Sequence, residues 1–199
     1  MRSSGSTPSP SHRPPVRLLL QVVGDDHPKA CTGRRLLHRG LADPWARGGS
    51  RGPPPILLDP YAKGPLSPAD QSAAEAGGLL VVDCSWNKLS ERGRFADPAG
   101  RRTFPRRLPL LIAGNPQHYG RLGELNTVEA FGAALWILGR PAEARALLES
   151  FHGGEAFLEL NGMRLAEYAG ADGPAAIEAA EVSLFSRDDL GAAPVPPRR

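Results

Sequence analysis

Four short apolar runs, each about the length of a buried strand, alternate along the chain with segments that favour turns or helices. The runs are residues 16–23, 56–60, 79–84 and 108–114. A helix is predicted over 66–77, between the second and third runs, with Ser67 as its N-cap and Pro68 in its first turn. Because parallel strands require such crossover connections, this order predicts an α/β fold with a mainly parallel sheet covered by helices.

The length of 199 residues suits one domain, and the 21 prolines and 23 glycines indicate long loops or loose ends. We expect disordered tails at 1–15 and 188–199, an N-terminal α/β portion over 16–63, and a larger portion over 64–187. The charge is uneven: residues 1–107 hold 17 Lys/Arg and 9 Asp/Glu, whereas 108–199 hold 7 and 12. The basic half favours a phosphate-bearing partner, with an ordinary solvated surface as the alternative.

Several classes of protein and site lose support because the sequence lacks the patterns that they require. The sequence contains no G-x-x-x-x-G-K-[ST] phosphate loop, no G-x-G-x-x-G, and no apolar run long enough to span a membrane. Asp25 and Asp26 lack a third acidic neighbour, so we predict no metal site. Cys31 and Cys84 fit reduced thiols of a cytoplasmic protein, and Cys84 has no neighbouring histidine that would activate it as a nucleophile.

The run "VVDCSW" ends in polar and aromatic side chains, with Asp83 and Trp86 just past its apolar part. The strand 108–114 is likewise followed by "NPQHYGRLGEL" (115–125), which is rich in turn-forming residues. Ligands of open α/β sheets bind at the carboxyl ends of strands, so both places are candidate sites. Capping of the next turn by Asp83 is the simpler alternative. A helix then follows, with Asn126 as N-cap, Glu129 as its capping-box partner and Gly139 at its end.

Six segments in this order resemble the S-adenosylmethionine-dependent aminocarboxypropyltransferases that modify small-subunit ribosomal RNA. They are "DHPKACTGRRL", "ILLDP", "GGLLVVDCSW", "RRLPLLIAGNPQHYG", "LNTVEAFGAALWILG" and "LLESFHGGEAFLELN", within residues 17–170. The resemblance implies a SPOUT-like sheet with a C-terminal trefoil knot. It also implies transfer of the 3-amino-3-carboxypropyl group to N3 of a uridine or pseudouridine, with release of methylthioadenosine.

The resemblance further implies site residues. Asp83 and Trp86 are expected to act at the amino-acid end of S-adenosylmethionine. The expected cofactor contacts are Thr32, Leu58, Asp83, Trp86, Leu110, Leu111, Asn115, Tyr119, Leu125 and Thr127. The RNA is expected to meet Lys29, Arg34, Arg35, Arg101, Arg102, Arg106 and Arg107. Glycine stands at 114 and 132, where the resemblance leads us to expect alanine.

The partner implied is small-subunit rRNA or a pre-ribosomal particle, bound by a monomer in the cytoplasm, with no membrane contact. Two alternatives stay open at this point. One is an RNA methyltransferase that uses the same cofactor, and the other is a ribosome-assembly factor without catalytic activity.

Overall fold

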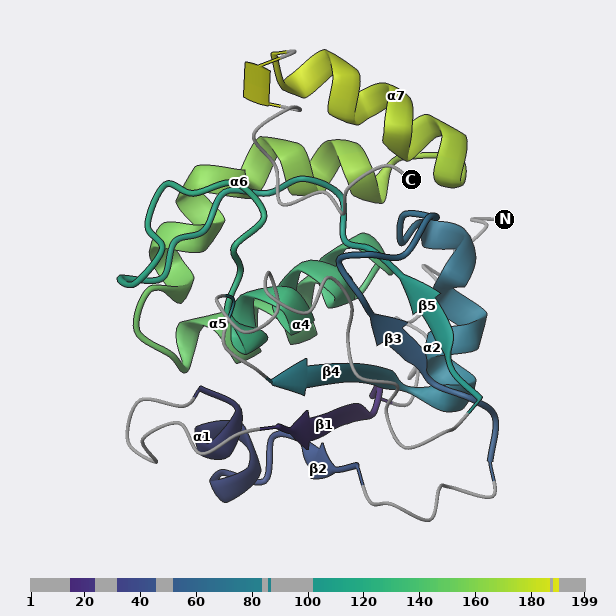
Figure 1. Cartoon of the computed structure of the whole chain (residues 1–199), viewed down its shortest axis with the longest axis vertical. Coiled ribbons are helices and arrows are strands. Elements are labelled where there is room, and N and C mark those ends of the chain that lie inside the picture. Colours follow the sequence, from purple (N-terminus) through teal and green to yellow (C-terminus); the bar gives the residue numbers. More distant parts are fainter. Residues whose placement is uncertain are drawn as a thin grey trace, which may run out of the picture.

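The five strands form one parallel sheet in a computed structural model that describes residues 15–23, 32–45, 52–83, 86, 102–186 and 188–189. The strand order is β2-β1-β4-β3-β5 (Figure 1). The strands are β1 (Leu18–Val22), β2 (Asp43–Pro44), β3 (Ile56–Leu58), β4 (Leu79–Asp83) and β5 (Phe104–Arg106), and every neighbouring pair is parallel. The predicted α/β class with a parallel sheet is confirmed.

Six helices flank this sheet in the described part of the chain (Figure 1). They are α1 (Thr32–His38), α2 (Gln71–Gly77), α4 (Thr127–Ile137), α5 (Pro141–Glu149), α6 (Gly154–Ala169) and α7 (Pro174–Leu184). The predicted capping box of α4 is present, because Glu129 N donates to Asn126 Oδ1 and Asn126 N donates to Glu129 Oε2. The helix predicted over 66–77 begins instead with a short 3-10 turn, Pro68–Asp70, and continues as α2.

Side chains of β4 alternate between two apolar clusters, as the two-residue period of a strand requires. Leu79 and Val81 belong to the main core, which α4 fills with the fully buried Phe131 and Ile137. Leu80 and Val82 face the opposite side of the sheet with other apolar residues. Because both faces of β4 are buried, the sequence of this central strand is continuously apolar from Leu79 to Val82.

The strand predicted at 108–114 is wrong: the fifth strand lies earlier, at Phe104–Arg106. Side chains of α6 and α7, instead of a neighbouring strand, bind the backbone of the predicted segment. Asn161 accepts from Ile112 N at 2.9 Å and donates to Ile112 O at 2.7 Å. Leu110 N donates to Glu181 Oε1 at 2.8 Å, and Tyr168 donates to Leu110 O at 3.0 Å. Burial raises the pKa of the Tyr168 phenol, so it stays neutral and keeps this proton.

Other backbone groups of this segment pair with the chain that follows it. Gly123 N donates to Leu111 O at 2.9 Å, and Ala113 N donates to Arg121 O at 2.8 Å. The segment therefore folds back on itself around a loop of residues 114–126, which we call the site loop. Loop structure was predicted for 115–125, and the structure confirms it.

The two glycines that replace the expected alanines stand where an added Cβ would meet close neighbours. A Cβ at Gly114 would lie 2.5 Å from the backbone nitrogen of Phe157 in α6. A Cβ at Gly132 would lie 2.6 Å from Cγ of Leu148 in α5. Both distances are shorter than ordinary van der Waals contacts. At Gly114 the obstacle is the backbone of α6, so alanine does not fit, whereas at Gly132 it is the Leu148 side chain, which would have to shift.

Candidate active site at the carboxyl end of β4

Asp83 is the last residue of β4, and two helices enclose its carboxylate. Thr127, at the start of α4, donates from Oγ1 to Asp83 Oδ1 at 2.9 Å. Gly33, in the first turn of α1, packs so closely that a Cβ there would lie 2.2 Å from Asp83 Oδ2. The structure thus brings two predicted cofactor contacts, Asp83 and Thr127, together, and a third, Thr32, directly precedes the glycine.

Substitution of Gly33 with alanine is expected to destabilise the protein through Asp83. We expect Gly33→Ala to cost about 1–3 kcal/mol of unfolding free energy, in the range of an overpacked core. In an Asp83→Ala background the same change should cost less, because only the flexible Leu20 side chain, 2.8 Å from the added Cβ, remains in the way. Urea denaturation of the four proteins gives the coupling, and additive costs would contradict the contact.

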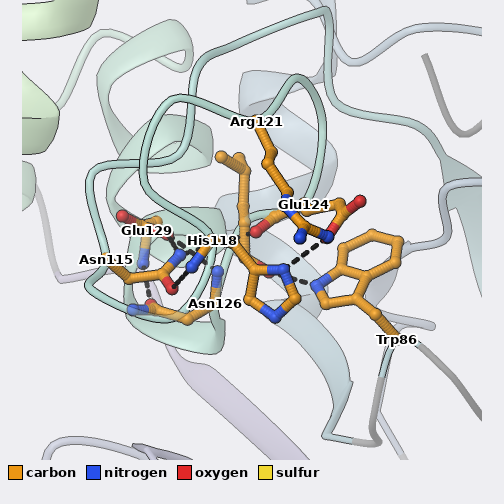
Figure 2. Close-up of polar contacts among 8 residues, drawn as sticks. Trp86, Asn115, His118, Arg121, Glu124, Asn126 and Glu129 are labelled. Atoms are coloured by element: carbon orange, nitrogen blue, oxygen red, sulfur yellow. Dashed lines mark hydrogen bonds and ion pairs between the residues drawn. The ribbon is translucent and has the colours of Figure 1, made fainter. Parts of the chain in front are cut away.

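Trp86 lies beyond β4, where a hydrogen bond to the site loop fixes its ring. Its Nε1 donates to the carbonyl oxygen of Leu125 at 3.0 Å (Figure 2). The side chain is half-buried, and Leu125 itself is buried. Two more of the predicted contacts are therefore neighbours, and the position of Trp86 depends on the shape of the site loop.

One buried carboxylate ties the two ends of the site loop together. Glu129 Oε1 accepts from Gly114 N at 2.8 Å. Its Oε2 accepts from Asn115 Nδ2 at 2.7 Å and from Asn126 N at 2.8 Å (Figure 2). Glu129 is only 1% exposed, and burial raises the pKa of its carboxyl while these N–H donors oppose the rise. The sequence predicted Glu129 only as a helix cap, so its contact with Asn115 was missed.

A second carboxylate links residues within the loop. His118 Nδ1 contacts Glu124 Oε2, and Arg121 Nη1 lies 3.2 Å from the same oxygen (Figure 2). The backbone N–H of His118 donates to Asn115 Oδ1 at 3.0 Å. Sequence analysis did not single out His118 or Glu124, because a histidine and a glutamate in an irregular loop have no spacing that predicts a contact.

The other expected cofactor contacts differ in their surroundings. Leu58 is buried at the end of β3, and Leu111 is completely buried in the core. Leu110 is held through its backbone by α6 and α7, as described above. Tyr119 is 62% exposed on the site loop. Their roles toward a cofactor stay predictions.

The expected RNA contacts fall into three groups. Lys29 and Arg101 lie outside the described residues, as do Asp25, Asp26, Cys31 and Cys84. Arg34, Arg35 and Arg102 are exposed. Arg106 pairs with Asp70 at 3.0 Å, and Arg107 pairs with Glu181 through two hydrogen bonds of 2.7 and 2.8 Å. The guanidinium groups of Arg106 and Arg107 thus already have carboxylate partners within the protein, and their RNA contacts stay predictions.

The described part of the chain contains neither a cluster of metal ligands nor a helix suited to a membrane. Its His, Cys, Asp and Glu side chains form no group of three or more that could hold a metal ion. None of its helices combines the length and the apolar character needed to cross a membrane.

Comparison with known proteins gives consistent matches along most of the chain. The family described as "Ribosome biogenesis protein, C-terminal" matches residues 56–185. A 16S rRNA aminocarboxypropyltransferase of Methanopyrus kandleri is 42% identical over 155 residues, which cover 78% of this chain and 90% of that protein. The 18S rRNA aminocarboxypropyltransferase of Schizosaccharomyces pombe is 39% identical over 78% of this chain and 52% of its own length.

A solved structure agrees with these matches. The SAM-dependent rRNA:acp-transferase Tsr3 from Vulcanisaeta distributa superposes with a TM-score of 0.73 and 33% sequence identity, covering 88% of this chain and 93% of that one. The chain therefore belongs to the family of small-subunit rRNA aminocarboxypropyltransferases.

Proposed function

We propose that this protein transfers the 3-amino-3-carboxypropyl group of S-adenosylmethionine to N3 of a uridine or pseudouridine in small-subunit rRNA, with release of methylthioadenosine. The observation that carries the proposal is the meeting of Asp83, Thr127 and Gly33 at the end of β4, next to a tryptophan that the site loop holds. Family membership supports the same reaction, since the relatives matched are named for it.

The residues at this site fit the proposed cofactor. S-adenosylmethionine supplies an electrophilic carbon attached to a positively charged sulfur. The carboxylate of Asp83 favours a cation nearby, and the face of the Trp86 indole offers an apolar and weakly negative surface to the same group. Leu125 supplies an apolar side chain for the adenine end, and Leu111, which is completely buried, supports this wall from behind. We propose the remaining expected contacts, Thr32, Leu58, Leu110, Asn115, Tyr119 and Thr127, as the rest of the pocket.

The protein contributes to the reaction by orienting the cofactor and the RNA base relative to each other. Asp83 is held by Thr127 and packed against Gly33, so its carboxylate keeps one position before any ligand binds. Trp86 is fixed in the same way through Leu125. Correct orientation of two reactants can lower a barrier by roughly 7–11 kcal/mol. A base that swings out of its stack to meet these side chains costs least in single-stranded RNA, so we propose a loop nucleotide as the target.

Isotope labelling of the cofactor tests the reaction. The protein is incubated with unmodified small-subunit rRNA and S-adenosylmethionine labelled either on the carboxyl carbon or on the S-methyl group. Only the carboxyl label should enter the RNA, with methylthioadenosine as the by-product. Methyl label in the RNA together with S-adenosylhomocysteine would instead show a methyltransferase. No transfer of either label would favour an assembly factor without catalytic activity.

We also propose the finer features that the resemblance implies: a SPOUT-like trefoil knot in the C-terminal half, a division near residue 63, a monomer, and a cytoplasmic location. The knot is proposed from the resemblance alone, since the hydrogen bonds of Leu110 and Ile112 to α7 and α6 are ordinary packing contacts. Mechanical unfolding from the two ends would test it, because a tightened knot leaves the chain shorter than its full extended length.

A further inference from the structure

Three basic side chains of helix α1 and that of the next residue, Arg39, surround one open hollow. Arg34, Arg35, His38 and Arg39 line a cavity of about 290 Å³ on the surface of this helix. They form two pairs at a spacing of four residues, which places them on adjoining stripes of the helix. Three of the four described lining side chains carry a guanidinium group, which favours an anion.

Two of these side chains rest on a fixed aromatic platform. The guanidinium carbons of Arg35 and Arg39 lie 5.0 and 4.7 Å from the ring centre of Phe151, which is buried in the connection between α5 and α6. Arg39 Nη1 also donates to the carbonyl oxygen of Ser150 at 2.6 Å. Stacking and this hydrogen bond limit the freedom of the two side chains, so less entropy is lost when they bind a ligand.

The charges of this pair are not balanced by carboxylates. Among the described residues, neither Arg35 nor Arg39 forms an ion pair, whereas Arg106, Arg107 and Arg140 each do. Two guanidinium groups that share one ring repel each other. A phosphate between them would remove this repulsion, and its oxygens match the planar donor fork of arginine.

Arg35 and Arg39 belong to the same stretch of chain as Gly33, which packs against Asp83 in the proposed active site. Gly33 of α1 packs against Asp83, and α1 lies beside the carboxyl end of β1 (Figure 1). Arg35 and Arg39 follow Gly33 by two and six residues, or about 3 and 9 Å along the helix axis. At about 100° per residue, Arg35 and Arg39 lie about 200° and 240° around the helix from Gly33, so the pair is on the side of α1 that faces away from Asp83. Only RNA that extends past the proposed active site and over the far side of α1 would reach it.

We propose that Arg35 and Arg39, stacked on Phe151, clamp one backbone phosphate of the substrate RNA where its strand passes over α1. This inference rests on the proposed function and extends it. Arg39 and Phe151 add to the RNA contacts that the resemblance implies, among which Arg34 and Arg35 were already expected. The proposal also distinguishes Arg35 and Arg39 from Arg106 and Arg107, whose guanidinium groups form ion pairs with carboxylates of the protein.

The test measures RNA affinity of the full chain as a function of salt. Fluorescence anisotropy with a labelled single-stranded fragment of small-subunit rRNA gives Kd between 50 and 300 mM KCl. For the double variant Arg35→Gln/Arg39→Gln we expect a loss of about tenfold in affinity at low salt and a salt slope smaller by about 0.7, the value for one phosphate contact on a single strand. The affinity for S-adenosylmethionine, measured by calorimetry, should stay unchanged.

Arg145→Gln is the matched control, because Arg145 also stacks on an aromatic ring, Trp136 at 5.5 Å, but lies 3.9 Å from Glu149. It should alter neither Kd nor the slope. An unchanged salt slope in the double variant would contradict the proposed clamp. If Arg145→Gln changed Kd and the slope as much as the double variant does, the effect would come from general surface charge and not from a clamp. If polyglutamate of equal charge displaced the RNA equally well, the assignment to RNA would be wrong.

The variant Phe151→Leu tests whether the aromatic ring contributes to RNA binding independently of the charges of Arg35 and Arg39. This variant keeps an apolar side chain in the core but removes the ring, and we expect it to weaken RNA binding about threefold. The labelling assay separates failure of the clamp from failure of the function. A double variant with an unchanged salt slope, in a protein that still transfers the carboxyl label, would reject the clamp alone. A wild-type protein that transfers no label would reject the function, whatever the slope.

Discussion

Glu129→Ala is expected to destabilise the protein by more than about 3 kcal/mol and to weaken S-adenosylmethionine binding. The substitution removes the acceptor of three N–H groups, those of Gly114, Asn115 and Asn126, and each buried donor left without a partner costs about 1–3 kcal/mol. The site loop would lose the link between its two ends and with it the position of Leu125. Urea denaturation and calorimetry measure the two effects.

Glu159→Ala is a suitable control, because Glu159 is an exposed glutamate on α6 and should change stability by no more than about 0.5 kcal/mol. Glu129→Gln is the sharper variant. An amide can accept on one side only, so its NH₂ group would face a backbone or side-chain N–H, and we expect it to be less stable than the wild type. A Glu129→Gln protein of unchanged stability would contradict the hydrogen bonds described here.

The same carboxyl group gives stability a dependence on pH with a defined sign. Burial raises the pKa of Glu129 in the folded state, so the folded protein holds this proton more tightly than the unfolded chain. The stability that Glu129 gains from this proton is fully present below the ordinary pKa of glutamate. It is lost as the pH rises through the raised pKa of the folded state. This component of the pH profile should be absent from the Glu129→Gln variant.

Arg107→Ala is expected to cost about 3–5 kcal/mol of unfolding free energy, the range for a buried ion pair that loses one partner. Arg107 binds both oxygens of Glu181, which is mostly buried and also accepts from Leu110 N. Without Arg107 this carboxylate would keep its burial and lose its counter-charge. Thermal unfolding measures the loss, and Arg107→Lys should restore part of it through a single contact.

Arg106→Ala provides the comparison within the same segment. Its pair with Asp70 is more exposed, so we expect a smaller cost than for Arg107. The result also tests the RNA contacts predicted for both residues. If Arg107→Ala folds with wild-type stability but loses RNA affinity, Arg107 contacts RNA and the pair with Glu181 is unimportant for folding.

Features encoded by neighbouring residues could be predicted from the sequence. The strand end at Asp83 follows from an apolar run that stops at a polar residue, and the start of α4 follows from Asn126 and Glu129, three positions apart. Trp86 was selected by resemblance. Its partner, the Leu125 carbonyl, could not be selected, because a backbone oxygen leaves no mark in the sequence.

Features set by distant residues could not be predicted. The segment 108–114 has the composition of a strand, and nothing within it shows that Asn161, Tyr168 and Glu181 will satisfy its backbone. The arginines at 106 and 107 likewise look alike in sequence, while their carboxylate partners lie 36 and 74 residues away. Local pattern specifies the elements of this fold, and long-range polar contacts decide which segments join the sheet.

The dependence of residues 108–114 on α6 and α7 has a consequence during protein synthesis. The side chains that bind Leu110 and Ile112 lie 49, 58 and 71 residues later in the chain. At 5–20 residues per second, the ribosome needs about 4–14 s to add the last of them. For that time the nascent chain carries an apolar, strand-like stretch whose final partners do not yet exist. Slow codons between positions 115 and 181 would lengthen this interval and with it the opportunity for aggregation.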